Sequence, residues 1–142
     1  MTASEIRMFC HVCSSEGLPT PVLEYMFGQE VFGRNWRADF FFDHNGIKLS
    51  VEVEGIFYNN SQGTSRHQTG KGYKDDMQKY NACSLLGIKL LRFTSTQALK
   101  QPILCCKMIK VALGIKEVDV EIFSLFALPV KKSQRKKTKN EK

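Results

Sequence analysis

The feature that most constrains the fold is a pair of β-like segments joined by a tight-turn sequence. Residues 36–43 are rich in aromatic side chains, and apolar residues alternate strictly with polar residues over 47–54. His44, Asn45 and Gly46, which lie between them, are typical of a hairpin turn. Because side chains alternate between the two faces of a strand, the pattern predicts an antiparallel hairpin with one polar face.

The segments on either side of this hairpin predict an α/β fold. In chain order we expect a helix over 4–16, a strand over 22–27, a turn over 28–35, the hairpin, an irregular loop over 55–73, a helix over 74–86, a strand over 88–93 and a helix over 96–113. A short apolar strand directly after a helix is typical of the end of a βαβ unit. The order therefore predicts a mixed central β-sheet flanked by helices. Residues 118–130 are compatible with a terminal strand or with a packed extension.

The length and charge of the chain predict one domain and a tail. The 142 residues are 42% hydrophobic and 25% charged, as in an ordinary globular domain. Of the net charge of +7, residues 131–142 carry six, because they contain seven basic side chains and one acidic one. We therefore expect a single domain over 1–130 and a disordered basic tail over 131–142. The tail binds polyanions or, alternatively, only improves solubility.

Several absences in the sequence predict a soluble intracellular protein that does not enter membranes. No apolar run is long enough to span a bilayer, and the first residues lack the pattern of a secretory signal. Five cysteines, an odd number, are expected to be reduced in the cytoplasm. Cys10 and Cys13 have the spacing of zinc ligands, but no second such pair completes a site, so buried helix positions are favoured.

Three carboxylates are expected to lie close together in the hairpin. Asp39 interrupts an apolar run, where burial of its charge would require a cation. The turn folds Asp39 back toward Glu52 and Glu54, which share one face of the second strand. Such a cluster repels itself unless cations hold it, and oxygen ligands of this kind suit Mg²⁺ or Mn²⁺. The alternative is a solvated strand face with an ion-paired aspartate.

Six short stretches of the sequence together resemble a known enzyme family. In order, they are GLPxPVxEYxF, WRADF, LSVEVEG, SRHQTGKGY, DMQKYN and LLGIKLLRFT, which fall within residues 17–95. They resemble small phage-type nucleases of the PD-(D/E)XK superfamily, related to its very-short-patch-repair and Holliday-junction-resolvase branches. The resemblance implies a restriction-endonuclease-like core and an origin in a phage or mobile element. It also implies a homodimer that hydrolyses DNA, selecting a Holliday junction, a mismatch or a nick.

The resemblance also implies roles for particular residues. Asp39 matches the metal-binding aspartate of the superfamily, and Glu52 matches its second acidic ligand. The Val53 carbonyl completes the donor set for Mg²⁺ or Mn²⁺. Glu24 matches an upstream glutamate, which binds the metal or a nearby water, or else forms a surface ion pair.

The sequence departs from the family at Glu54, where the motif has a lysine that orients the attacking water and offsets negative charge. Either Glu54 holds the water or a second metal ion, or a basic residue elsewhere supplies the charge. The available basic residues are Arg66, His67, Lys71 and Lys79. We favour Lys79, because a helix packed on the sheet would direct Asp76, Lys79 and Tyr80 toward the carboxylates. His67 could act as general acid or base, and Lys71 is the next choice.

These features predict a metal-dependent DNA endonuclease. Contacts to DNA are expected from basic residues of the loop, the following helix and the tail, namely Arg66, His67, Lys71, Lys74, Lys131, Lys132, Arg135, Lys136 and Lys137. Two alternatives stay open. One is a catalytically inactive nucleic-acid-binding protein that retains the nuclease fold, and the other is a basic interaction protein with no nucleic-acid role.

Overall fold

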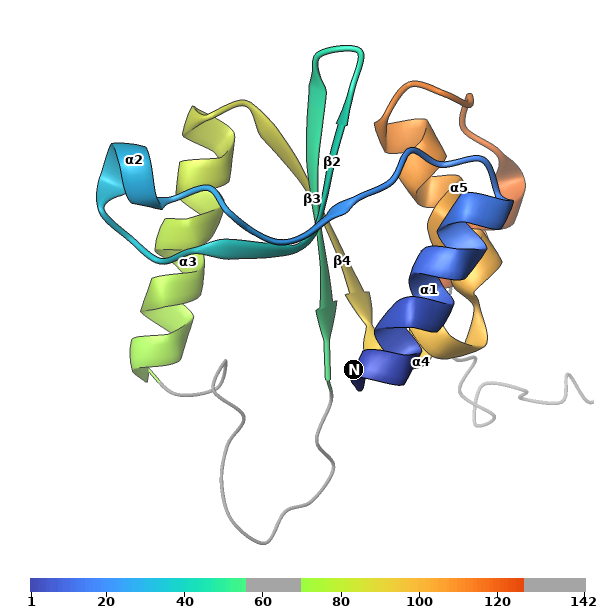
Figure 1. The fold of residues 1–142 in the computed structure, drawn as a ribbon, viewed down its shortest axis with the longest axis horizontal. Coiled ribbons are helices and arrows are strands. Elements are labelled where there is room, and N and C mark those ends of the chain that lie inside the picture. Colours follow the sequence, from blue (N-terminus) through green and yellow to red (C-terminus); the bar gives the residue numbers. More distant parts are fainter. Residues whose placement is uncertain (56–69, 127–142) are drawn as a thin grey trace, which may run out of the picture.

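The computed structural model describes residues 1–55 and 70–126 and shows a mixed α/β fold (Figure 1). Its elements are α1 (Ala3–Ser15), β1 (Val22–Met26), α2 (Gln29–Phe32), β2 (Arg37–His44), β3 (Ile47–Glu54), α3 (Gly70–Leu85), β4 (Ile88–Thr94), α4 (Ser95–Lys100), α5 (Pro102–Ala112) and the 3-10 helix η2 (Val120–Phe126). The predicted mixed sheet flanked by helices is confirmed.

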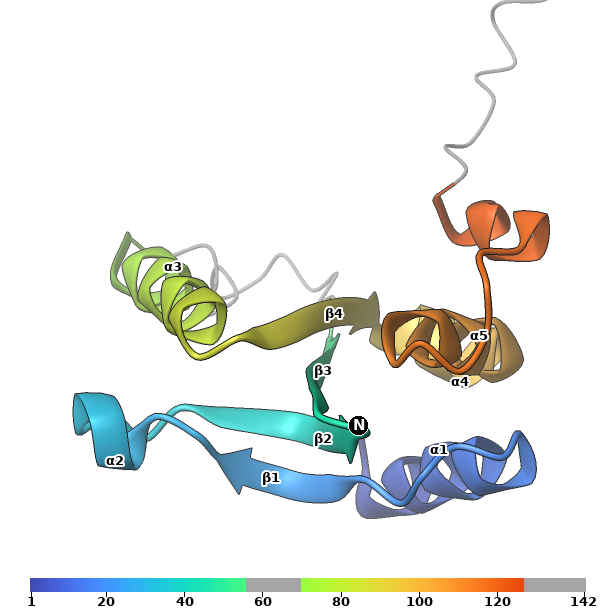
Figure 2. The same cartoon turned by 90° about the horizontal axis from the view of Figure 1, so that it is seen from above.

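The four strands form one sheet in the order β1-β2-β3-β4. β1, β2 and β3 are antiparallel neighbours, whereas β4 is parallel to β3. The parallel pair needs a crossover, which α3 supplies as the sequence predicted. Viewed from above in Figure 2, β1 and β4 lie at opposite ends of the twisted sheet.

The sheet splits between its two central strands. Pairing of β2 with β3 ends at Phe40 and Val51. Beyond this point β2 pairs only with β1, as far as Arg37, and β3 pairs only with β4, as far as Glu54. Figure 1 shows β2 turning aside while β3 continues downward. The split leaves β2 and β3 without backbone pairing beyond Phe40 and Val51, and side chains of both strands lie beside this gap.

Helices cover both faces of the sheet (Figures 1 and 2). On one face α1, α4 and α5 enclose the larger core, in which Phe9, Phe42 and Ile109 are almost completely buried. On the other face α3 packs over a smaller cluster that includes Phe41, Cys83 and Ile88. Each sheet face thus has its own apolar layer, as expected for an α/β domain.

Local sequence explains where the main elements begin and turn. Thr2 caps α1 in a capping box, because its hydroxyl accepts from the Glu5 backbone N–H and the Glu5 carboxylate accepts from Thr2. In the hairpin turn Asn45 and Gly46 both have positive φ, as a type I′ turn requires. These residues set the register that brings β3 beside β2.

Three expectations about the elements need correction. The predicted helix over 96–113 is two helices, because Gln101 leaves the helical conformation, with φ −131° and ψ 48°, before Pro102, which begins α5. The helix expected over 74–86 already starts at Gly70, and the expected turn over 28–35 contains the short helix α2. Of the two alternatives for residues 118–130, the described part agrees with the packed extension, because it contains η2, which an ion pair between Glu121 and Lys107 joins to α5, and no strand.

Candidate active site

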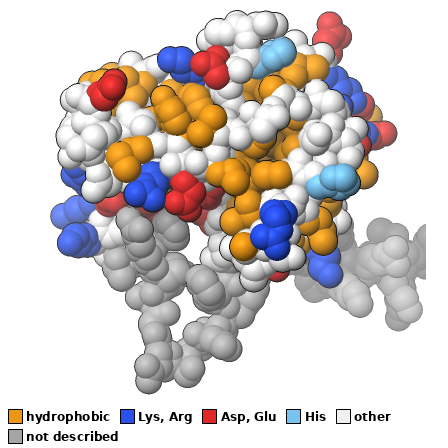
Figure 3. Space-filling model, viewed as in Figure 1, with side chains coloured by type: hydrophobic (Ala, Val, Ile, Leu, Met, Phe, Trp, Pro, Cys, Tyr) orange, Lys and Arg blue, Asp and Glu red, His pale blue; other side chains and the backbone are white. Residues whose placement is uncertain are grey.

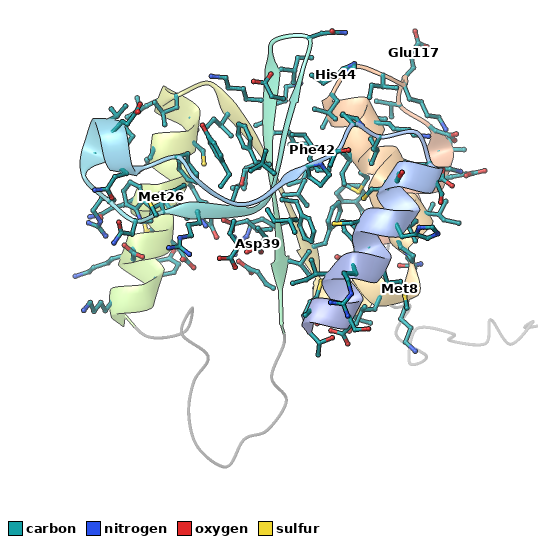
Figure 4. All side chains as sticks on the ribbon, viewed as in Figure 1. Met8, Met26, Asp39, Phe42, His44 and Glu117 are labelled. Carbon is teal, nitrogen blue, oxygen red and sulfur yellow. The ribbon has the colours of Figure 1, made fainter. Side chains whose placement is uncertain are left out.

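Asp39 lies at the split of the sheet, near the crossing of the strands in Figure 4. Its side chain is exposed, although its neighbours Ala38 and Phe40 are buried. The expectation that this carboxylate is buried was therefore wrong, because the alternation of β2 turns Asp39 away from the core. Oδ2 of Asp39 accepts a hydrogen bond from the backbone N–H of Val53 at 2.9 Å. This bond joins β2 to β3 beyond their last ladder pair.

Glu52 is the buried carboxylate of the site, with 6% of its surface exposed. Lys79 of α3 forms an ion pair with it, so the structure brings the favoured lysine to the predicted acidic ligand. Burial raises the pKa of Glu52, Lys79 opposes this shift, and the charges of Asp39 and Glu54 raise the pKa further. Asp39 and Glu54 therefore lie close enough to Glu52 for their charges to act on it.

Glu54 is held by an arginine that the sequence reasoning missed. Arg92 of β4 forms an ion pair with Glu54, and its guanidinium lies 4.6 Å from the centre of the Tyr80 ring. Burial raises the pKa of the Tyr80 hydroxyl, whose oxygen has no hydrogen-bond partner among the described residues. Arg92 could be assigned to the site only from the register of the parallel pair, which places it directly beside Glu52. The sequence alone does not give this register.

Glu24 lies opposite Asp39 in β1, between the pairs that Leu23 and Tyr25 form with β2. Its φ of 49° is unusual for a residue other than glycine and marks local backbone strain within the strand. The carboxylate accepts a hydrogen bond from Arg37 at 3.1 Å, which is the surface ion pair that the sequence left as an alternative. Glu24, Asp39 and Val53 all line one open hollow, together with side chains of α1.

The site is a mixed cluster of charges rather than a group of free carboxylates. Among residues 1–55 and 70–126, no three His, Cys, Asp or Glu side chains form a group that could hold a metal ion. The expected triple carboxylate cluster is thus divided, because Lys79 engages Glu52 and Arg92 engages Glu54. Figure 3 views the opposite side of the sheet, from β1 and α1, where a few acidic and basic side chains lie side by side below and to the left of the centre.

The other predicted basic residues lie away from these carboxylates or outside the described residues. Lys71 and Lys74 are exposed in the first turns of α3. Lys71 precedes Lys79 by eight residues, about 12 Å along a helix, so Lys79 is the residue of α3 placed at the site. Outside the described residues lie Arg66, His67, Lys131, Lys132, Arg135, Lys136 and Lys137.

The cysteines occupy the buried helix positions that were expected, since Cys13, Cys83, Cys105 and Cys106 are buried. Sγ of Cys106 donates a weak hydrogen bond to Sγ of Cys13 across 3.6 Å, between α5 and α1. Cys10 is only half-buried on the same helix as Cys13. In the described chain these thiols do not form a group suited to zinc.

Comparisons with protein-family models, curated proteins and solved structures found no match to this chain. The site is therefore interpreted from its own geometry and from the sequence. Across the described ranges, the structure contains no helix of the length and apolarity needed to cross a membrane.

Proposed function

We propose that this protein is a metal-dependent endonuclease that hydrolyses phosphodiester bonds in DNA. The observation that carries the proposal is that Asp39 accepts a hydrogen bond from the backbone of Val53 while Lys79 pairs with the adjacent Glu52, both where β2 and β3 part. Two carboxylates and an ammonium group from three different elements converge there. This combination can hold a divalent cation and neutralise a phosphate.

The order of elements supports a restriction-endonuclease-like core. A helix precedes three antiparallel strands, and a second helix then leads to a fourth strand parallel to the third. Asp39 and Glu52 lie on the two central strands, where the sequence resemblance to PD-(D/E)XK nucleases expects the acidic ligands. The topology and the positions of the motif residues thus agree with each other.

The donor set at the split fits Mg²⁺ or Mn²⁺. Magnesium binds proteins through one or two carboxylates and keeps several waters, so it does not require three acidic side chains. Asp39 and Glu52 would hold the ion, with the Val53 carbonyl as the third donor that the resemblance implies. A bound ion would polarise the phosphate and acidify a water molecule.

Lys79 supplies the positive charge that the motif lacks at Glu54. Its ammonium group reaches the carboxylates from α3, where it is only 17% exposed. A cation held at this depth can offset the negative charge that develops on the phosphate during hydrolysis. Its position favours the second of the two explanations for the missing lysine, in which another element provides the charge.

The test is cleavage of labelled linear duplex, mismatched duplex, nicked duplex, single strand and four-way junction, each with Mg²⁺, Mn²⁺ or EDTA. We expect metal-dependent cutting that Asp39→Asn and Glu52→Gln each reduce at least about 100-fold. Asp43→Asn is the matched control, because Asp43 is an exposed carboxylate at the other end of β2. Cutting that persists in EDTA, or in Asp39→Asn, would contradict the proposal. Sedimentation of the protein with and without junction DNA tests the homodimer.

The second candidate is an inactive nucleic-acid-binding protein with the same fold. It is favoured by the two ion pairs, because Lys79 and Arg92 already neutralise Glu52 and Glu54 without a metal. Here removal of a carboxylate should strengthen DNA binding, since it removes repulsion from the phosphates. Tighter binding by Asp39→Asn, together with no cutting by the wild type on any substrate, would favour this candidate.

A further inference from the structure

We infer that Arg92 is a phosphate-binding residue of this site, and that Glu54 and Tyr80 are positioning residues that hold its guanidinium in place. The inference rests on the proposed function and assigns Glu54 a role other than that of a metal ligand or water holder. It follows from the charges at the split, the contacts of Arg92 and the register of β4.

Lys79 and the proposed divalent cation together balance the three carboxylates of the site, so an incoming phosphate adds negative charge that neither of them offsets. Asp39, Glu52 and Glu54 are negative, and DNA adds a further negative charge at each phosphate. Lys79 is engaged by Glu52, so it offsets only part of this charge. Of the other described arginines near β2, Arg34 pairs with Asp75 of α3, and Arg37 pairs with Glu24 at the open surface of β1.

Arg92 has both the position and the free surface for this role. The parallel register places it beside Glu52, and its side chain is 39% exposed. A guanidinium has five N–H donors in a planar fork, and the ion pair with Glu54 involves its Nη2. Other donors of the fork can therefore bind the oxygens of a phosphate while Glu54 stays in contact.

Glu54 and Tyr80 fix the orientation of this arginine. Glu54 holds one end of the guanidinium, and the ring of Tyr80 lies 4.6 Å from its central carbon. A stacked and ion-paired guanidinium loses little freedom when it binds an anion. At position 54, where the resembling family has a lysine, this chain thus has a carboxylate that holds an arginine from the neighbouring strand.

The first experiment compares Arg92→Gln and Arg92→Lys with the wild type, by single-turnover cleavage at saturating DNA and by binding at several salt concentrations. Arg92→Gln is expected to lower the saturated rate at least about 100-fold and to reduce the slope of log K against log salt by about one. Arg92→Lys should give an intermediate rate, because the charge remains but the fork is lost. Wild-type rate and slope in Arg92→Gln would overturn the inference.

Arg34→Gln is the matched control, because it removes an arginine that has the same kinds of contacts as Arg92 but lies away from the proposed phosphate site. Arg34 also pairs with a carboxylate and lies 4.7 Å from the centre of an aromatic ring, that of Trp36. It should leave the saturated rate unchanged. Urea unfolding of each variant identifies loss of fold, and if Arg92→Gln does not fold, the rate and slope of Arg92→Lys decide.

The second experiment separates the role of Glu54 from that of a metal ligand. If Glu54 acts through Arg92, Glu54→Gln costs less than Arg92→Gln, and the double variant is no slower than Arg92→Gln. The Mg²⁺ concentration for half-maximal rate should then stay unchanged in Glu54→Gln. A raised Mg²⁺ requirement, or a further loss in the double variant, would overturn the positioning role. If the wild type does not cleave, the proposed function fails, and the salt slope alone decides the role of Arg92.

Discussion

Replacement of Lys79 by methionine should destabilise the protein in a way that depends on pH. Lys79→Met keeps an unbranched side chain, one atom shorter than that of lysine, but leaves the buried Glu52 carboxylate without its cation. Removal of one partner of a buried ion pair costs about 3–5 kcal/mol. In the variant, Glu52 can bind a proton and so avoid being a buried charge without a partner. The pH of the assay therefore sets an upper limit on the destabilisation that Lys79→Met can cause.

The limit is the free energy of protonating an ordinary carboxyl group at the assay pH. It rises by about 1.4 kcal/mol for each pH unit above the ordinary glutamate pKa of 4.5. At pH 7.5 the limit is about 4 kcal/mol, and at pH 5.5 it is about 1.4 kcal/mol. We therefore expect Lys79→Met to cost about 2–4 kcal/mol at the higher pH and much less at the lower one.

Because the pKa of Glu52 is raised on folding, Glu52→Gln and Lys79→Met should have unequal effects on stability. Its pKa is raised on folding, chiefly by burial, so the folded state binds this proton more tightly than the unfolded state. Stability from this group is therefore lost as the pH rises from the ordinary value through the raised one. Glu52→Gln removes that loss and should change stability far less than Lys79→Met does.

Urea unfolding at both pH values, with the double variant Glu52→Gln/Lys79→Met, measures the coupling. In the glutamine background the methionine should cost less than about 1 kcal/mol, because no buried charge remains. The same loss from Lys79→Met at pH 5.5 and 7.5, or in both backgrounds, would refute the reasoning.

Three further predictions concern the remainder of the fold. Phe42→Ala should lower the free energy of unfolding by about 3–5 kcal/mol, because Phe42 is completely buried in the larger core; urea unfolding measures this, and a loss below about 1 kcal/mol would contradict the packing. Thr94→Ala should cost about 1 kcal/mol, because Thr94 and Gln97 form the capping box of α4; an equal loss in Thr96→Ala, measured by thermal unfolding, would argue against a specific cap. At pH 8 a thiol reagent should modify Cys83 and Cys105 only after the protein unfolds. Both thiols are buried, and burial raises the pKa of Cys83 to about 11 and that of Cys105 to about 12. Rapid modification of either residue in the native protein, located by mass spectrometry, would contradict this prediction.

The hairpin was predictable because short-range patterns determine it. Strict alternation over 47–54 and a turn that tolerates positive φ predict β3 and its partner, and both are confirmed. The apolar strand after Gly87 was expected inside the sheet, as the end of a βαβ unit; it does pair in parallel with β3, but it lies at the edge of the described sheet. Helix ends were less predictable, since the break at Gln101 depends on its own backbone angles.

The site was predictable only where one residue type or one helix face determined it. Lys79 was correctly placed at the carboxylates, because a helix that packs on the sheet must direct a polar stripe at the polar face of β3. Arg92 was missed, because its approach to Glu54 depends on the register of the parallel ladder. The exposure of Asp39 was misjudged. The apolar residues around it suggested burial, whereas the alternation of side chains along a strand leaves Asp39 exposed between the buried Ala38 and Phe40.

The way in which β4 joins the sheet also determines when the site becomes competent. Asp39, Glu52 and Glu54 belong to a local hairpin, which needs only short-range contacts to form. Lys79 and Arg92 arrive with the crossover helix and the parallel strand, whose pairing closes a much longer loop. A chain in which only the hairpin has formed therefore has the carboxylates without their two cations. Under the proposed function, such a chain would repel a phosphate until α3 and β4 have joined the hairpin.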